Sequence, residues 1–245
     1  MAEGFFMGTG LFITGTDTGV GKTFIGGLLA GLLRRRGMDV GVMKPVESGC
    51  LRRDGALYPQ DAYELREKAQ SLDPLTDIVL YALEMPAAPA VAAEKEGITI
   101  QLQAIVEKFQ ALSARHQLTI VEGAGGLLVP LTRREDNTHL ILALNVPVLV
   151  VARASLGTIN HTLLTINWAK ALGIQILGVV INDPMGNLSQ TERENLQALV
   201  ERLPVPLLGI VPHLPLSFHE VLDRVEPALD LNQFLVLLRR PETGT

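Results

Sequence analysis

The amino-acid sequence predicts an α/β fold, a single doubly wound domain whose mostly parallel sheet is flanked by helices. Short apolar runs alternate with longer segments of helical periodicity along the whole chain. A glycine-rich segment stands between the first apolar run and the first helical segment, as is typical of nucleotide-binding α/β proteins. No break in composition and no repeat divides the 245 residues. We therefore expect one domain over residues 1–245, with flexible ends at 1–9 and 241–245.

The glycine-rich segment at 15–23 matches the P-loop pattern G-x-x-x-x-G-K-[ST]. An apolar run at 11–13 precedes it, and a helical pattern at 24–33 follows it. Its glycines allow backbone N–H groups to converge on phosphate oxygens, next to the positive end of the following helix. Lys22 adds a full charge for the β- and γ-phosphates, and the Thr23 hydroxyl can bind Mg²⁺. The sequence thus predicts a P-loop NTPase fold that binds a nucleoside triphosphate.

The overall composition indicates a cytoplasmic enzyme. A net charge of −5 without a long basic run argues against non-specific binding to nucleic acid. The single cysteine, Cys50, excludes an internal disulfide and a thiolate zinc site and suits a reducing compartment. The N-terminus lacks the basic and apolar segments of a signal peptide. The most apolar stretch, 140–152, is interrupted by Asn145 and Pro147 and is too short to span a bilayer. We expect no nucleic-acid partner and no membrane partner.

The first half of the chain places a second lysine at the predicted ligand site. A short strand at 40–43 ends in Lys44, and the carboxyl ends of strands are where ligands bind in open α/β sheets. Residues 50–59 are expected to form a loop. A helix begins at Gln60, where Asp61 is either an N-cap or a ligand at the site. Residues 72–97 contain three prolines and are expected to be irregular and to flank the site, before a helix over 99–116.

The second half supplies a buried carboxylate and the remaining strands. A strand at 118–121 ends in Glu122, the usual position of a second metal-organising carboxylate facing a P-loop, although a surface acid before a glycine turn is the alternative. Ser189 and Glu192 form a capping box for a helix that we expect to end at Leu203. The other expected strands are 148–151, 176–181 and 207–211, and the other expected helices are 137–144, 155–172 and 228–240.

Taken together, these segments resemble the dethiobiotin synthetases of biotin biosynthesis over nearly the whole chain. The resemblance rests on an ordered set of motifs: GTDTGVGKT at 15–23, KPVESG at 44–49, QDA at 60–62, VEGAGG at 121–126, SLGTINHTLLT at 155–165, VIND at 180–183 and LLGIVPHL at 207–214. It implies that 7,8-diaminononanoate, CO₂ and ATP are converted, with Mg²⁺, to dethiobiotin, ADP and phosphate. One amine would capture CO₂ as a carbamate, which the γ-phosphoryl group activates for attack by the second amine.

The resemblance also assigns roles to residues of this chain. Lys44 and Lys22 match catalytic positions, Ser48 matches a substrate-binding position, and Thr23, Asp61 and Glu122 match the Mg²⁺ ligands. The nucleotide-binding positions are Gly19, Val20, Gly21, Lys22, Thr23, Phe24, Asp61, Glu122, Gly123, Ala124, Gly125, Asn182, Asp183, Pro212, His213 and Leu214. In this family the start of the helix at Gly157, Thr158, Ile159 and Asn160 comes from the neighbouring subunit of a homodimer and holds the substrate carboxylate.

The sequence departs from some relatives at two positions. Gly19 stands where some have an acidic residue in the phosphate loop, so a carboxylate contact is missing there. An acidic contact to the base follows the Pro212 turn in the family, and neither His219 nor Glu220 is assigned to it here.

Two other classes of protein share parts of this pattern. A partitioning or positioning ATPase of the ParA and MinD type carries an extra lysine near the start of the loop, where this chain has Asp17, and this chain has no clear basic membrane helix. A glutamine-dependent amidase of the cobyrinate type needs an amidotransferase domain with a nucleophilic cysteine, for which 245 residues with Cys50 alone leave no room. Both fit the sequence less well than a dethiobiotin synthetase.

Overall fold

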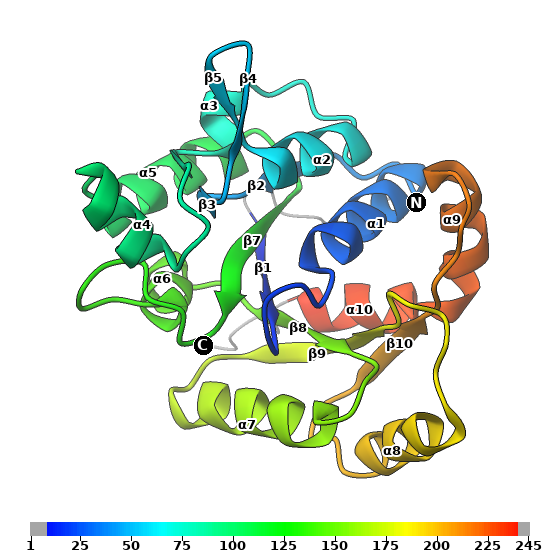
Figure 1. The fold of residues 1–245 in the computed structure, drawn as a ribbon. Helices are drawn as coiled ribbons and strands as arrows, with labels where there is room; N and C mark the ends of the chain where they lie inside the picture. The colour runs from blue at the N-terminus through cyan, green and yellow to red at the C-terminus, as the bar shows by residue number, and fades with distance from the viewer. Residues whose placement is uncertain (1–8, 240–245) are drawn as a thin grey trace, which may run out of the picture.

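A computed structural model describes residues 9–239, in which a six-stranded parallel sheet lies between two layers of helices (Figure 1). The strand order is β10-β9-β8-β1-β7-β2. Its strands are β1 (Thr9–Gly15), β2 (Val40–Met43), β7 (Leu118–Gly126), β8 (Val148–Arg153), β9 (Ile176–Asn182) and β10 (Leu207–Val211). The main helices around it are α1 (Lys22–Arg35), α2 (Gln60–Lys68), α5 (Leu102–Ser113), α6 (Asn137–Leu144), α7 (Thr158–Ala171) and α8 (Gln190–Val200). The predicted doubly wound, mostly parallel fold is confirmed.

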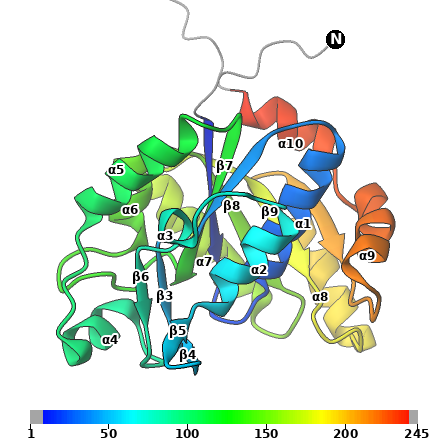
Figure 2. The same cartoon turned by 90° about the horizontal axis from the view of Figure 1, so that it is seen from above.

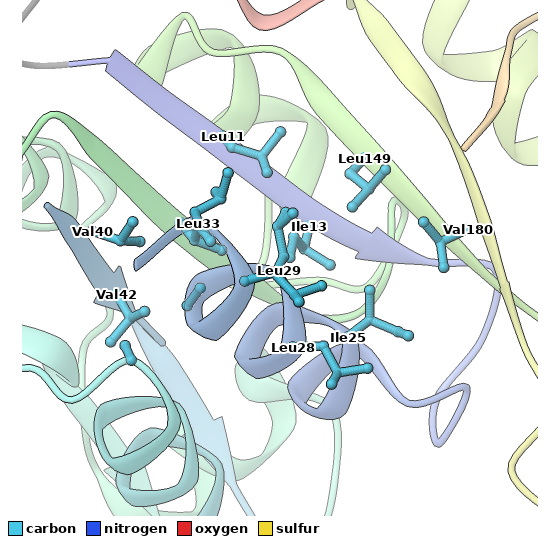
Figure 3. Close-up of a cluster of buried hydrophobic side chains, with 14 of the residues drawn as sticks. Leu11, Ile13, Ile25, Leu28, Leu29, Leu33, Val40, Val42, Leu149 and Val180 are labelled. Atoms are coloured by element: carbon cyan, nitrogen blue, oxygen red, sulfur yellow. The ribbon is translucent and has the colours of Figure 1, made fainter. Parts of the chain in front are cut away.

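Alternating side chains of β1 build a hydrophobic core on each face of the sheet. Leu11 and Ile13 point to one face, where they pack with α1, as Figure 3 shows. Phe12 points to the opposite face and belongs to the cluster that contains α5, α6 and α7. Figure 2 shows α1 on one side of β1 and β7, and α5 and α6 on the other. This burial holds β1 rigidly, so the loop that leaves its carboxyl end starts from a fixed point.

Two segments expected to lack regular structure are ordered, so these predictions were wrong. The expected loop at 50–59 contains the antiparallel hairpin β4 (Leu51–Arg53) and β5 (Ala56–Tyr58), which projects from the body of the molecule (Figure 1). Asp54 and Gly55 both have positive φ at its turn, as a two-residue hairpin of Asp-Gly requires. The region 72–97 contains α3 (Leu75–Ile78), β6 (Tyr81–Leu83) and α4 (Pro89–Glu96), and β6 pairs with β3 (Val46–Ser48).

The C-terminal region also differs from the sequence prediction. The closing helix, α10 (Leu231–Leu238), begins three residues later than expected because Asp230 caps it by accepting the Gln233 N–H at 2.8 Å. It follows α9 (Phe218–Val225), which the sequence analysis missed, and the 3₁₀ turn η1 (Glu226–Ala228). The expected flexible ends lie outside the described residues, apart from Thr9, which begins β1 instead.

Candidate functional site

The phosphate loop follows β1 and leads directly into α1. Gly19 and Gly21 have φ values of +70° and +96°, a backbone conformation that glycine adopts without steric cost. Gly21 is the N-cap of α1, so Lys22 and Thr23 occupy the first turn of the helix. The Lys22 ammonium lies over the loop, with its Nζ 3.4 Å from the Asp17 carbonyl oxygen. The loop therefore places backbone N–H groups, a helix N-terminus and a cation at one site.

A charged network joins three segments beside the phosphate loop. The Lys44 ammonium donates to Asp61 Oδ2 at 2.8 Å and to Glu122 Oε1 at 2.6 Å. The Thr23 hydroxyl donates to the same Glu122 oxygen at 2.9 Å. Lys44 follows β2, Glu122 lies on β7, and Asp61 lies on the first turn of α2. The N-cap of α2 is Pro59, whose own side chain makes no capping hydrogen bond, so the alternative of Asp61 as an N-cap is wrong.

Burial and charge set the protonation states in this network. Burial alone would lower the pKa of Lys44, but the carboxylates of Glu122 and Asp61 outweigh it and raise that pKa above its usual range. Burial opposes the charged form of Asp61, yet the Lys44 ammonium brings the pKa of Asp61 below its ordinary value. Lys22 lacks such close anions, and burial together with the Lys44 charge lowers the pKa of Lys22 to about 8. Lys44 thus favours its cationic form beside Asp61 and Glu122.

Glu47 is a residue of this site that the sequence analysis missed. Its buried carboxylate accepts the backbone N–H groups of Asp61 at 2.9 Å and Ala62 at 3.0 Å. These are orphan donors at the start of α2, so Glu47 fixes the turn from which the Asp61 side chain projects. Burial is the main cause of a raised pKa at Glu47. The sequence signal was an acidic residue at the centre of the expected strand-end motif, which a pattern alone does not separate from a surface acid.

The network lines a cavity of about 680 Å³. Ten of the predicted site residues contribute to its wall: Gly19, Gly21, Lys22, Thr23, Lys44, Ser48, Asp61, Glu122, Ala124 and Gly125. An apolar part of the wall comes from Val46, Val129 and the segment 86–89. The sequence analysis expected 72–97 to flank the site, and residues 86–89 do so. The cavity therefore combines a charged end with a wall that suits methylene groups.

The remaining nucleotide-site predictions lie around this cavity rather than on its wall. Gly123 packs against Phe12, and a Cβ at Gly123 would lie 2.6 Å from that ring. The Phe24 ring faces Lys68, whose Nζ lies 5.0 Å from the ring centroid. The Val20 side chain is buried in the core beneath the loop, which leaves the Val20 backbone for a ligand.

The predicted purine-binding residues gather at the carboxyl ends of β9 and β10. Asn182 donates from Nδ2 to the Val20 carbonyl oxygen at 2.9 Å, which joins this region to the phosphate loop. Asp183 accepts the N–H groups of Met185 and Gly186. The His213 side chain lies beside Gly186, and Pro212 and Leu214 flank His213 in the chain.

The two candidates for the base contact have other partners. The backbone carbonyl of His219 accepts from Arg35 at 3.2 Å, and Glu220 accepts from the Ser217 N–H in the capping box of α9.

The start of α7 lies at a separate cavity. Residues 157–160 line a hollow of about 420 Å³ together with Asn167 and Asn195. Gly157 has a φ of +86° and caps the helix without a side-chain hydrogen bond. The structure of one chain therefore does not bring this helix start to Lys44.

The oxygen donors present fit a hard divalent cation. Glu122 Oε2 is buried and has no hydrogen-bond partner within residues 9–239, and it belongs to the same carboxylate that Thr23 and Lys44 contact. An orphaned buried carboxylate oxygen is a costly feature that a metal ion would satisfy. In this part of the chain no cluster of three His, Cys, Asp or Glu residues is found. The candidate set consists of two carboxylates and one hydroxyl, which meet at Lys44 and Glu122.

Comparisons with known proteins agree with this geometry. A family model described as an AAA domain matches residues 9–220. The ATP-dependent dethiobiotin synthetase BioD of Anaeromyxobacter dehalogenans is 46% identical, over 84% of this chain and 92% of its own length. The protein of the same name from Bacillus licheniformis is 43% identical, over 91% of this chain and 96% of its own length.

Among solved structures, the MinC:MinD cell division complex of Aquifex aeolicus is similar with a TM-score of 0.54 and 15% identity, covering 97% of this chain and 98% of that chain. At such low identity this similarity shows the fold alone. The matches to the two synthetases cover more than two thirds of the chain. The chain therefore belongs to the dethiobiotin synthetase family of ATP-dependent enzymes.

Proposed function

We propose that the cavity beside the phosphate loop carries out the ATP-dependent carboxylation and ring closure of 7,8-diaminononanoate with CO₂, which yields dethiobiotin, ADP and phosphate in biotin biosynthesis. The observation that carries this proposal is the buried Lys44 ammonium, held between Asp61 and Glu122 at the mouth of the loop. Family membership supplies the reaction, and the single cavity with charged and apolar walls suits a chain with two amines and several methylenes.

The nucleotide binds with its phosphates in the loop and its base at β9 and β10. The free N–H groups of the loop and the first turn of α1 face the phosphate oxygens, with Lys22 as the cation. Phe24 takes part through its backbone, because its ring packs against Lys68. Asn182, Asp183 and the 212–214 turn lie at the adjoining strand ends, where the base would rest.

Mg²⁺ would be held by Thr23, Asp61 and Glu122. All three supply oxygen atoms, the ligands that this cation prefers. When bound, the ion neutralises charge that develops on the phosphates during transfer. The Lys44 ammonium also favours the charged form of Asp61, because it holds the pKa of that carboxyl below its ordinary value.

The reaction needs charge neutralisation and positioning more than a protein nucleophile. One substrate amine attacks CO₂ and loses a proton, so a carbamate forms. A carbamate oxygen then attacks the γ-phosphorus, and ADP leaves. The second amine attacks the carbonyl carbon of this mixed anhydride and expels phosphate, which closes the cyclic urea. Lys44 and Lys22 hold the anionic carbamate and the γ-phosphate together against their mutual repulsion.

The substrate chain lies along the apolar wall formed by Val46, Val129 and residues 86–89, with Ser48 at the polar end. We propose that its carboxylate is held by the start of α7 from a second copy of the chain in a homodimer. Two observations support the dimer. The helix start lies at its own cavity within one chain, and α7 exposes Leu164 at 60% and Trp168 at 47%, one helical turn apart. An apolar stripe of this kind is typical of a surface that another chain covers.

We also propose that residues 9–239 work as one domain and that the protein acts in the cytoplasm, where ATP is supplied. Both hydrophobic clusters include side chains of β1 and β8, so the two layers of helices share one sheet. No helix in residues 9–239 has the length and apolar character needed to cross a membrane.

Stoichiometric release of ADP tests the proposed activity. We expect ADP release to require both 7,8-diaminononanoate and CO₂ and to match the amount of dethiobiotin formed. A nucleotide switch of the ParA and MinD type would instead hydrolyse ATP without the diamine. ADP release that is unchanged by omitting the diamine would overturn the proposal.

A further inference from the structure

Two side chains at the ends of neighbouring strands donate hydrogen bonds to the backbone of the phosphate loop. Arg153 ends β8, and its Nη2 donates to the Thr18 carbonyl oxygen at 3.1 Å. Asn182 ends β9 and donates from Nδ2 to the Val20 carbonyl oxygen at 2.9 Å. Arg153 and Asn182 are direct partners in the register of β8 and β9. The two contacts therefore act side by side on alternate carbonyl groups of one loop.

The direction of these contacts matters because every peptide bond of the described chain is trans. In a trans peptide the C=O and the following N–H point in opposite directions. Holding the Thr18 carbonyl toward Arg153 thus turns the Gly19 N–H away from β8. In the same way, the contact of Asn182 with the Val20 carbonyl turns the Gly21 N–H away from β9. Gly19 and Gly21 both line the cavity, and their positive φ values allow successive N–H groups to converge on an anion.

We propose that Arg153 is a positioning residue that fixes the orientation of the Gly19 N–H for phosphate binding. This inference rests on the proposed nucleotide site and adds a residue outside the cavity wall to it. Arg153 acts through the loop backbone, since it contacts the Thr18 carbonyl and lies 3.2 Å from the place that a Cβ of Gly19 would take. A side chain at residue 19 would therefore press on the guanidinium.

The surroundings of Arg153 indicate a role other than stabilising the fold. Its Nε is buried and has no hydrogen-bond partner among the residues that the structure describes. An unpaired buried donor costs stability, and no ion pair of Arg153 is found in residues 9–239 to offset it. The one hydrogen bond of the Arg153 side chain found in residues 9–239 is its contact with the loop.

Binding of MgADP to the full chain tests this role without requiring turnover. We compare wild type with Arg153→Leu, Arg153→Lys and the control Arg202→Leu, because Arg202 also donates to a backbone carbonyl, that of Ala198 in α8. Arg153→Leu should raise the Kd for MgADP and the KM for ATP roughly tenfold, as loss of one charged hydrogen bond implies. The KM for the diamine and the melting temperature should stay close to those of wild type. Arg153→Lys should recover part of the affinity, and Arg202→Leu should bind as wild type.

The outcomes separate this inference from the proposed function. Arg153→Leu with wild-type affinity for MgADP overturns the positioning role and leaves the proposed function intact, whereas a wild-type protein that binds no MgADP overturns both. A loss of affinity in Arg153→Leu that Arg153→Lys does not relieve also counts against it, since the lysine keeps a cationic donor. If Arg153→Leu does not fold, Arg153→Met, which also lacks a donor, takes its place, and an affinity equal to that of wild type again overturns the role.

Discussion

Lys22 and Lys44 carry the same charge, but their surroundings give them different tasks. Lys44 is neutralised by two carboxylates, whereas Lys22 lies over the phosphate loop without such a partner. Lys22→Ala should therefore weaken MgADP binding at least roughly tenfold and also slow turnover. Lys44→Ala should lower kcat about 10²- to 10³-fold with little change in nucleotide affinity, because its charge acts on the transferring groups.

Calorimetric titration with MgADP and single-turnover kinetics measure the two effects separately. Lys170→Ala is the matched control, because Lys170 donates to the Pro204 carbonyl far from the cavity. Near-wild-type turnover for Lys44→Ala would refute its catalytic role.

Asp61 offers a second test at the scale of a single residue. Asp61→Asn keeps the shape of the side chain and removes its charge, and α2 loses no cap because Pro59 is the N-cap. The Mg²⁺ concentration for half-maximal rate should rise by roughly tenfold or more. This concentration is measured by following the rate at saturating ATP while MgCl₂ is varied. An unchanged dependence on Mg²⁺ would show that Asp61 is not a ligand.

The place of a residue in the site could be predicted from sequence where a motif surrounds that residue. Site residues without such a motif were missed. Lys22 and Thr23 were expected in the phosphate loop and Glu122 at the end of a strand, and the structure brings them together. Glu47 and Arg153 were missed because each acts on backbone atoms of a distant segment. Because nearly every residue carries the same backbone N–H and C=O groups, the sequence does not show which of them a side chain contacts. Such contacts can be identified only once the fold is known.

At the scale of elements, α3 is tied to α5 by charged contacts. Hydrogen bonds from Arg115 and Lys108, at 2.7 and 2.9 Å, hold the pKa of Asp77 below its ordinary value. A carboxyl group whose pKa is lower in the folded state stabilises the fold above its unfolded pKa, and this contribution is lost as the pH falls through the folded pKa. Asp77→Asn should therefore lower the free energy of unfolding at pH 7 by about 1 kcal/mol.

Urea denaturation at several pH values measures this difference. It should shrink below about pH 4, where the wild-type carboxylate also becomes protonated. A difference that stays constant from pH 7 to pH 3 would contradict the charged contact.

Helices and strands with a clear periodicity of apolar residues could be predicted from the sequence. Short elements that are stabilised by tertiary contacts could not. The α6 helix has the predicted bounds, and the central strands lie where apolar runs indicated them. The hairpin of β4 and β5 was missed although its Asp54-Gly55 turn is a known hairpin signal, because the strands have only three residues each. The β3 and β6 pair depends on contacts between segments far apart in the chain, which no local pattern reports.

At the scale of the whole molecule, the parallel order of the strands explains why the site residues meet. Lys44, Arg153 and Asn182 stand at carboxyl ends of strands in one sheet, and Glu122 lies on β7 four residues before its end. This common edge could be predicted from the alternation of strands and helices. The place of α7 could not, since its helix start lies at a separate cavity in a single chain.

Mixing two inactive variants tests the proposed homodimer. Lys44→Ala removes the charged end of one site, and Asn160→Trp blocks the helix start that serves the other. After the subunits exchange, heterodimers should contain one intact site and regain part of the activity, which a coupled assay for ADP release detects. Heterodimers confirmed by native mass spectrometry that show no recovery would contradict a shared site, and so would full activity from a stable monomer.

The fate of the oxygen atoms of CO₂ tests the central claim, that ATP activates a carbamate at Lys44. The enzyme is mixed with ATP, the diamine and ¹⁸O-labelled CO₂ for a single turnover, before the label exchanges with water. If a carbamate oxygen attacks the γ-phosphorus and later leaves with it, the released phosphate carries one labelled oxygen and the cyclic urea carries the other. Phosphate without label, formed with an oxygen from water, would contradict the account.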